Sequence, residues 1–272
     1  MHSILVNIHN AARKISTGEI LLEKVLDAIV KHTTGDYELI CMVDGCTDES
    51  ENIVDKYANA QKIILPNVFE VKSNNAGLKQ SKGDYAIIIQ DDQVVCETGW
   101  NQRLQKPYDE FNDVFAVTAR VAHNFIRNPN SRDIHNPDGP QNNWCDYLTT
   151  CDGVGLKHGN LPRNTFAIRS TVCRGPLMLD MEDLRKLDYL DESFAPCDMD
   201  DHDLMFRAHK QLNKVCGAYS INMEADHAWS AIHGSGTPQW LYKAHHKNTK
   251  IFFERHKDIL DSRRIIENRV LK

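Results

Sequence analysis

Two adjacent aspartates follow an apolar run in the segment IIIQDDQVV, residues 87–95. The isoleucines predict a buried β-strand, because β-branched residues favour strands and a continuous apolar run is typical of a strand covered on both faces. Asp91 and Asp92 would stand at its carboxyl end. Paired carboxylates can hold a hard divalent cation that binds phosphate oxygens, although acids after a strand also simply begin turns.

A second acid ends another apolar run, in the segment VDGCTDES at residues 43–50. Asp44 stands where the strand stops, Gly45 permits a tight turn, and Thr47 is a plausible cap for the following helix. The first N–H groups of that helix could bind an anionic ligand. The same residue types also form ordinary strand-to-helix turns, so this motif alone favours an ordinary turn.

Further candidates lie in the second half of the chain. The segment DMDDHDLMFR, residues 198–207, crowds Asp198, Asp200, Asp201 and Asp203 together. Their mutual repulsion should raise the pKa of some of these carboxyls, which suits a general base, whereas a solvated acidic helix start is the alternative. Imidazoles are common metal ligands, and the candidates are the histidines of ADHAWSAIHGSG, namely His227 and His233.

The elements that must position these residues alternate between strand and helix patterns. We expect strands at 4–8, 37–43, 62–65, 69–71 and 85–89, and helices at 19–32, 48–60 and 76–81. This rhythm predicts a parallel α/β sheet, in which ligands bind beyond the carboxyl ends of the strands. Asp44 and the Asp91-Asp92 pair should therefore face one crevice.

The rest of the chain does not continue the alternation of strand and helix patterns. Residues 124–160 are rich in Asn, Pro and Asp and predict a long loop of the kind that is often functional. A helix is expected at 201–212 and a helical region at 238–262.

Composition narrows the class of protein. The 272 residues can bury a full core, and 41% hydrophobic with 26% charged residues is ordinary for a soluble globular protein. The net charge of −6 argues against nucleic acid as a partner. No segment is apolar enough for a membrane span or a signal peptide. The eight cysteines are scattered without a C-x-x-C pair, which argues against a zinc ribbon and predicts a reducing, cytoplasmic location, with peripheral membrane association left open.

Taken in order, these motifs resemble the inverting glycosyltransferases of family 2, over roughly residues 3–235. Val43 and Gln90 replace acids of the family pattern, and Asp200 replaces a glutamate. The matching stretches are VNIHN ending at Asn10, VDGCTD at 43–48, NAGLKQSKGDY at 75–85, QDD at 90–92, RGPL at 174–177, DESF at 191–194 and DDHDLMFR at 200–207, with His227 as the closing metal-binding histidine and His233 as second choice.

The resemblance implies an α/β protein of the GT-A fold: a Rossmann-like, mainly parallel central sheet flanked by helices, with a C-terminal helical segment. It implies a GT-A domain at 1–237, with a nucleotide-sugar half at about 1–120 and an acceptor half at about 121–237, and a helical extension at 238–272.

It also implies a hexosyltransferase-type activity that moves a sugar from a nucleotide-diphosphate sugar to an acceptor hydroxyl with inversion, on a glycan, lipid-linked or protein acceptor. Asp201 would be the catalytic base, with Asp92 and His227 holding Mn²⁺ or Mg²⁺. The remaining implied site residues are Asn10, Asp44 and Asp91 for the nucleotide and Arg174, Gly175, Asp200 and Asp203 on the acceptor side.

Two other functions remain open from the sequence. A sugar-nucleotide nucleotidyltransferase would share the sheet and the acids, but it normally has a glycine-rich loop after the first strand, where this chain has HNAARK. A non-catalytic nucleotide-sugar-binding module of the same fold is the other alternative.

Overall fold

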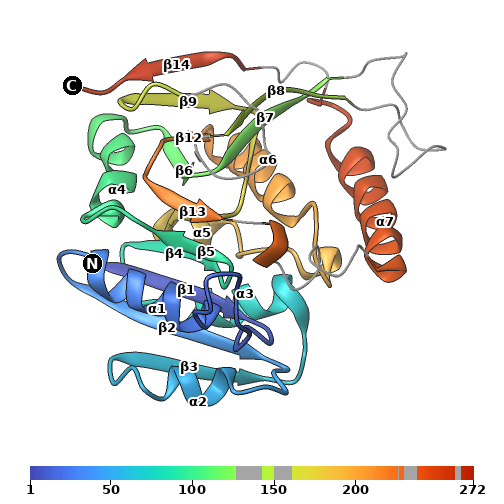
Figure 1. Ribbon diagram of the computed structural model, residues 1–272. Coiled ribbons are helices and arrows are strands. Elements are labelled where there is room, and N and C mark those ends of the chain that lie inside the picture. Colours follow the sequence, from blue (N-terminus) through green and yellow to red (C-terminus); the bar gives the residue numbers. More distant parts are fainter. Residues whose placement is uncertain (127–142, 150–160, 226, 230–237, 261–264) are drawn as a thin grey trace.

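The computed structural model describes residues 1–126, 143–149, 161–225, 227–229, 238–260 and 265–272 (Figure 1). The first 90 residues alternate strictly between strand and helix. These elements are β1 (His2–Ile8), α1 (Leu21–His32), β2 (Tyr37–Asp44), α2 (Ser50–Val54), β3 (Ala60–Leu65), α3 (Phe69–Gln80) and β4 (Tyr85–Gln90).

The rest of the chain is richer in short strands. Its elements are β5 (Gln93–Val95), α4 (Trp100–Glu110), β6 (Val114–Thr118), β7 (Val121–Ile126), β8 (Asn143–Thr149), β9 (Thr165–Arg169), β10 (Thr171–Cys173), β11 (Leu177–Asp180), α5 (Met181–Lys186), η1 (Glu192–Phe194), α6 (Asp200–Leu212), β12 (Val215–Ala218), β13 (Met223–Ala225), η2 (His227–Trp229), α7 (Gln239–His256) and β14 (Glu267–Val270).

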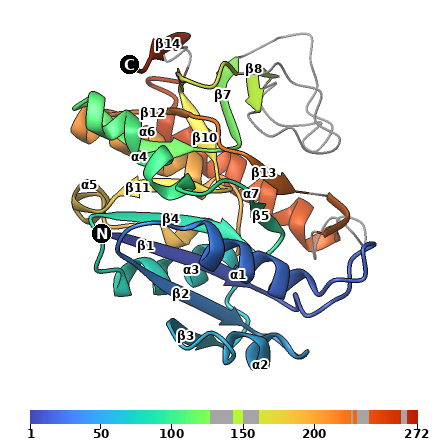
Figure 2. The same cartoon turned by 60° about the vertical axis from the view of Figure 1, so that its left-hand side comes forward.

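One nine-stranded sheet runs through the molecule in the order β14-β9-β12-β6-β11-β4-β1-β2-β3 (Figures 1 and 2). Its N-terminal part, β4-β1-β2-β3, is wholly parallel. Beyond β4 the sheet is mixed, because β11 runs antiparallel between β4 and β6. The predicted mixed α/β class with a largely parallel core and flanking helices is confirmed.

The isoleucine run of β4 lies in the middle of this sheet and is covered on both faces. Ile87 and Ile89 belong to the core cluster that contains residues of α1 and α4. Ala86 and Ile88 belong to the opposite cluster, with residues of α3, α5 and α6. Burial on both faces explains why this strand has no polar alternation.

Several expected elements differ from the structure. Phe69–Val71 was predicted to be a strand but begins α3, which also extends the short helix expected at 76–81. The helix expected at 48–60 is the five-residue α2. Aromatic and β-branched residues favour strands only weakly, and here tertiary contacts at the start of α3 override that preference.

The predicted loop at 124–160 is also partly wrong. The strands β7 and β8 pair antiparallel, with Phe125 opposite Trp144, and β10 pairs with the other side of β7. Residues 127–142 and 150–160 of the predicted loop lie outside the described residues.

The C-terminal helical region is confirmed as α7. The extension at 238–272 was predicted to be helical, but it also contains the strand β14. This strand pairs antiparallel with β9 and forms one edge of the central sheet. Within the described part of the chain, no helix is long and apolar enough to cross a membrane.

Candidate active site at the carboxyl edge of the sheet

The carboxyl ends of β1, β2 and β4 meet at one edge of the sheet, as predicted. Their register places Asn7 opposite Gln90 and Ile8 opposite Val43. His9, just beyond β1, joins the two acidic strand ends: its backbone N–H donates to Asp91 Oδ2 (2.8 Å) and its ring Nδ1 to the Asp44 carbonyl oxygen (2.7 Å). Two acidic turns that are distant in the sequence therefore share one site.

Asp44 holds the backbone at the start of α3. One carboxylate oxygen accepts from the N–H of Val68 and the other from the N–H of Phe69, both at 2.7 Å. Phe69 has a φ of 65°, a strained conformation for a bulky residue. The Asp44 side chain is only 3% exposed, so its observed role is to fix this turn, and a direct contact with a nucleobase stays a prediction.

Asn10 ties the loop after β1 to the loop after β2. Its Oδ1 accepts from the backbone N–H of Thr47 (2.8 Å), and its own backbone is left-handed, with a φ of 50°. Asparagine tolerates this conformation better than most residues. The predicted Asn10 position is thus at the site, where it shapes the loop that follows Asp44.

Asp91 is buried at the end of β4, and burial followed by the neighbouring Asp92 charge raises its pKa to about 7. The chain continues directly into β5, which pairs with β13 so that Ala225 lies opposite Gln93. Because this pairing is antiparallel, β13 ends at Ala225, beside the residue that follows Asp92. The side chain of His227 and the whole of His233 lie outside what the structure describes.

Gln90, one of the residues that depart from the family pattern, has a hydrogen-bond partner at each end of its amide group. Its Nε2 donates to Glu70 Oε1 (3.1 Å), and its Oε1 accepts from Gln93 Nε2 (2.8 Å). Glu70, on the first turn of α3, was not singled out in the sequence. It lay in a segment predicted as a strand, and only the true start of α3 directs it towards β4.

Arg174 continues this network to the acidic segment. Its guanidinium donates two hydrogen bonds to the carboxylate of Asp200 and one to Glu70 Oε2 (3.2 Å). The Arg174 side chain is 8% exposed and that of Asp200 is fully buried. Burial would lower the pKa of Arg174, but Asp200 and Glu70 outweigh it and raise that pKa well above its usual value.

Gly175 brings the Arg174 segment against the turn after β4. It has a φ of 119°, and a Cβ at this position would collide with the amide of Gln93. Only glycine readily combines this backbone conformation with such a close approach. The segment of Arg174 and Gly175, predicted on the acceptor side, is therefore in contact with the turn after β4, which was predicted on the donor side.

Asp201 lies at the start of α6, next to Arg174, and is 6% exposed. Its Oδ2 accepts from the backbone N–H of Arg174 (3.3 Å), and its Oδ1 accepts from the backbone N–H of His202 (2.9 Å) and from the His202 ring Nδ1. Burial opposes its ionisation, but the charges of His202 and Arg174 outweigh burial and hold the Asp201 pKa below its usual range.

The expectation of raised pKa values in this cluster is therefore only partly confirmed. Burial, with the Asp201 charge, raises the pKa of Asp200 even though Arg174 opposes this, whereas the pKa of Asp201 is lowered. The sequence showed the repulsion between acids but not the cations that the fold places beside them.

Asp203 was predicted on the acceptor side, and its buried carboxylate joins α6 to α7. It accepts from Arg207 Nε (2.7 Å) on its own helix, and from Arg255 Nη1 (2.8 Å) and His256 Nε2 (2.9 Å). The contacts with Arg255 and His256 hold α7 against α6, and an acceptor-side role for Asp203 stays a prediction.

An aromatic group that the sequence did not reveal stands beside Asp44. The rings of Phe69 and Trp240 meet edge to face at 4.6 Å, and His9 stacks on Phe69 at 6.3 Å. Trp240 is 38% exposed. The first turn of α7 thus reaches the carboxyl edge of the sheet.

Comparisons with solved structures show the same fold in glycosyltransferases. Residues 1–349 of TarS from S. aureus superpose with a TM-score of 0.55 at 14% identity, over 84% of this chain and 60% of that one. The same TarS fragment in complex with UDP-GlcNAc gives 0.58 at 15% identity, over 96% and 70%. The mannosyltransferase PcManGT from Pyrobaculum calidifontis, in complex with GDP-Man and Mn²⁺, gives 0.54 at 13% identity, over 89% and 59%.

The chain thus spans 60% of the TarS fragment. No curated protein matches it in sequence. The family described as "Glycosyl transferase family 2" matches residues 3–170, well over half of the chain, from β1 to the end of the strand β9. The protein therefore belongs to glycosyltransferase family 2 and has a GT-A-type fold.

Proposed function

We propose that this protein is a metal-dependent, inverting glycosyltransferase of the hexosyltransferase type, which transfers a sugar from a nucleotide-diphosphate sugar to an acceptor hydroxyl. One observation carries the proposal. A continuous set of hydrogen bonds runs from Gln90 through Glu70 to Arg174 and on to Asp201. It connects the strand end that precedes Asp91 and Asp92 to the candidate base, and a one-step displacement needs the donor site and the base at one reaction centre.

The nucleotide part of the donor would lie at the carboxyl edge of the sheet. Asn10 and Asp44 shape the two loops there, and the rings of Phe69 and Trp240 supply an apolar border. Asp91 would face the ribose. The UDP-GlcNAc and GDP-Man named for the similar structures support a nucleotide-sugar donor of this kind.

The residues near the turn after β4 fit a divalent cation. Asp92 lies close enough to the buried Asp91 for its charge to raise the Asp91 pKa, and β13, which precedes His227 in the chain, ends opposite Gln93. Carboxylate donors suit Mn²⁺ or Mg²⁺, and histidine is a common metal ligand. When bound, such an ion acts as a Lewis acid for the diphosphate leaving group.

Asp201 would receive the proton of the acceptor hydroxyl. Its lowered pKa keeps it ionised at neutral pH, and the hydrogen bonds from Arg174 and His202 fix the direction of its carboxylate. Asp200 would act indirectly, because its charge holds Arg174 in place. Attack on the anomeric carbon from the face opposite the leaving group inverts its configuration.

Thermal unfolding in the presence of UDP, GDP, CDP or dTDP, each with and without Mn²⁺, tests the donor site. At 100 times Kd, a bound nucleotide contributes about 2.7 kcal/mol, which raises Tm by roughly 5–10 °C for a chain of this size. We expect at least one nucleotide to do this only with Mn²⁺.

The Asp92→Asn variant should lose the Mn²⁺-dependent rise in Tm. Asp36→Asn, an exposed acid just before the amino end of β2, should keep it. If no nucleotide raises the Tm of the unmodified protein, the proposed function is wrong.

A further inference from the structure

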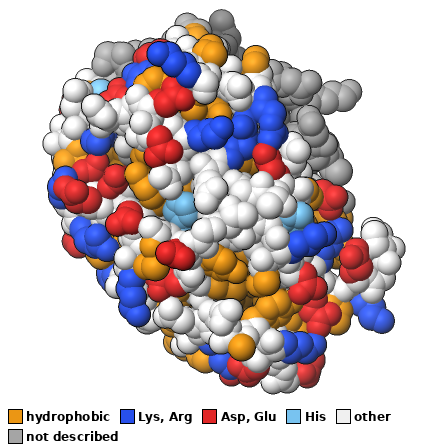
Figure 3. All heavy atoms as spheres, turned by 90° about the vertical axis from the view of Figure 1, so that its left-hand side faces the viewer, with side chains coloured by type: hydrophobic (Ala, Val, Ile, Leu, Met, Phe, Trp, Pro, Cys, Tyr) orange, Lys and Arg blue, Asp and Glu red, His pale blue; other side chains and the backbone are white. Residues whose placement is uncertain are grey.

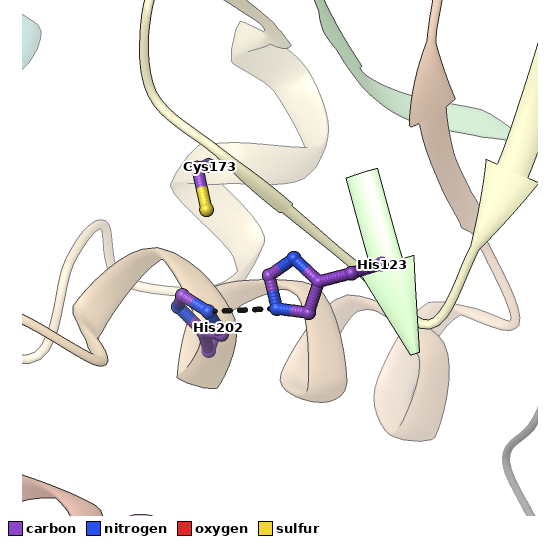
Figure 4. A group of neighbouring side chains, drawn as sticks. All are labelled: His123, Cys173 and His202. Carbon is purple, nitrogen blue, oxygen red and sulfur yellow. Dashed lines mark hydrogen bonds between the residues drawn. The ribbon is translucent and has the colours of Figure 1, made fainter. Parts of the chain in front are cut away.

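Three side chains with metal-binding atoms face one another near Asp201, and one of them, His202, is hydrogen-bonded to the Asp201 carboxylate. His123 lies on β7, Cys173 ends β10, and His202 is on the first turn of α6 (Figure 4). Their candidate ligand atoms all lie within 4.8 Å of one another. Both histidines are buried, at 0% and 4% exposure.

The two imidazoles have the spacing of ligands on one metal ion. The Nε2 atoms of His123 and His202 are 3.2 Å apart. In a tetrahedral zinc site, the bond lengths imply about 3.3 Å between two nitrogens and about 3.6 Å between nitrogen and sulfur. The nitrogens nearly have this separation, and the Cys173 sulfur has to approach by no more than about 1.2 Å.

The surroundings orient His202 as metal ligands are usually oriented. Its Nδ1 donates to Asp201 Oδ1, which leaves Nε2 directed at His123 and Cys173. A carboxylate on the other nitrogen of a ligating imidazole is a common support in zinc sites, because it fixes the tautomer and the ring. His123 is held by the β7–β10 ladder, in which it stands opposite Thr171.

We propose that His123, Cys173 and His202 bind one Zn²⁺ ion, with release of the Cys173 thiol proton and of the proton on Nε2 of the His202 imidazolium. The soft thiolate and two imidazoles select zinc over the hard cations that suit carboxylates. The ion would join β7, β10 and α6 behind Asp201. Its role is positioning, because it would fix the imidazole that holds the Asp201 carboxylate.

This site is separate from the donor-side acids, and it does not depend on the proposed transfer activity. Its ligands are distant in the sequence, at positions 123, 173 and 202, so no short spacing motif reveals them. Only the packing of α6 on the β7–β10 ladder brings them together.

Cobalt titration of the chelator-treated protein tests the site without nucleotide or activity. We expect one equivalent of Co²⁺ to give a near-ultraviolet thiolate-to-cobalt absorption band, and one equivalent of Zn²⁺ to abolish it. The purified protein should also contain about one zinc per chain by mass spectrometry of the elements.

Three variants locate the ion. Cys173→Ser should lose the band and bind zinc at least tenfold more weakly. Cys96→Ser, which removes an exposed thiol, and Asp92→Asn, which removes the donor-side acid, should both keep the band.

The proposal is wrong if the unmodified protein shows neither the cobalt band nor bound zinc. It is equally wrong if Cys173→Ser keeps both. Should Cys173→Ser fail to fold, the spectrum of the unmodified protein and of the two control variants still decides the matter.

Discussion

At the residue scale, the acids of this site differ mainly in the cations that face them. Asp201 has the charges of His202 and Arg174 beside it, whereas Asp91 has the charge of Asp92 beside it. The first environment stabilises a carboxylate and the second destabilises one. The pKa of Asp201 is therefore lowered and that of Asp91 is raised, although both carboxyls are buried in the same site.

Replacing Asp201 with Asn tests its role as the base. The amide keeps the size of the side chain and an oxygen for His202 but cannot take up a proton. We expect release of nucleoside diphosphate from the stabilising nucleotide sugar, with Mn²⁺, to fall by about 10²- to 10⁴-fold. The nucleotide-dependent rise in Tm should remain.

An Asp201→Asn protein as active as the original would exclude this residue as the base. If the original protein binds nucleotide but never releases product with any donor that binds, the non-catalytic module becomes the better explanation.

Arg174 neutralises two acids in a nearly dry environment. Replacing it with Met leaves Asp200 and Glu70 without their shared cation, and breaking a buried pair in this way costs about 3–5 kcal/mol. Urea unfolding should therefore show a lower midpoint with an unchanged slope. Arg185→Met, at an exposed position on α5, should change the stability by less than about 0.5 kcal/mol.

A loss below about 1 kcal/mol for Arg174→Met would show that the network contributes little to stability. The same network accounts for Gln90. A carboxylate at position 90 would lie against Glu70 and add another negative charge where only Arg174 compensates, whereas the amide donates to Glu70.

At the scale of elements, β14 closes one edge of the sheet with charged side chains. Arg269 donates from Nη1 and Nη2 to the two oxygens of Asp113, at 2.5 and 2.8 Å. This bidentate pair connects the last strand to the residue that precedes β6. Charged residues on an edge strand also discourage pairing with another molecule.

Arg269→Met should destabilise the protein by about 1 kcal/mol at pH 7, because the pair is partly exposed. The hydrogen bonds from Arg269 lower the pKa of Asp113. A lowered carboxyl pKa stabilises the fold above the unfolded value of about 3.9 and ceases to do so as the pH falls through the folded value.

The difference between Arg269→Met and the original protein should therefore be constant from pH 7 to about 5 and shrink below about pH 4. Urea midpoints measured across this range provide the test. A difference that grows on acidification would contradict the role given to Asp113.

At the scale of the whole molecule, the two halves of the chain are interleaved in one sheet. The strand β11, from the second half, lies between β4 and β6 of the first half. On the face in Figure 3, acidic and basic side chains are interspersed.

We therefore expect the full chain to unfold in one cooperative transition, with equal calorimetric and van't Hoff enthalpies. A fragment of residues 1–120 should fail to fold, because β4 and β6 would both lose β11. Two separate transitions, or a folded 1–120 fragment, would show that the nucleotide-sugar half is an independent domain.

The sequence by itself determined the parallel part of the sheet and the acids at its edge. Strand burial on both faces leaves a local signal, the continuous apolar run, and the acid that ends such a run must lie at the carboxyl edge. Asp44 and Asp91 were therefore placed correctly without coordinates, and the order of the motifs was enough to indicate the family.

The tertiary structure alone decided what each of these groups touches. The start of α3 at Phe69, the Glu70–Arg174–Asp200 network and the His123–Cys173–His202 cluster each join segments that lie tens of residues apart. Local propensity carries no information about such contacts, because their energy depends on burial and on neighbouring charges that only the folded chain supplies. The same reason explains why Asp201 and Asp203, which look alike in the sequence, have different partners: Asp201 contacts Arg174 and His202, and Asp203 contacts α7.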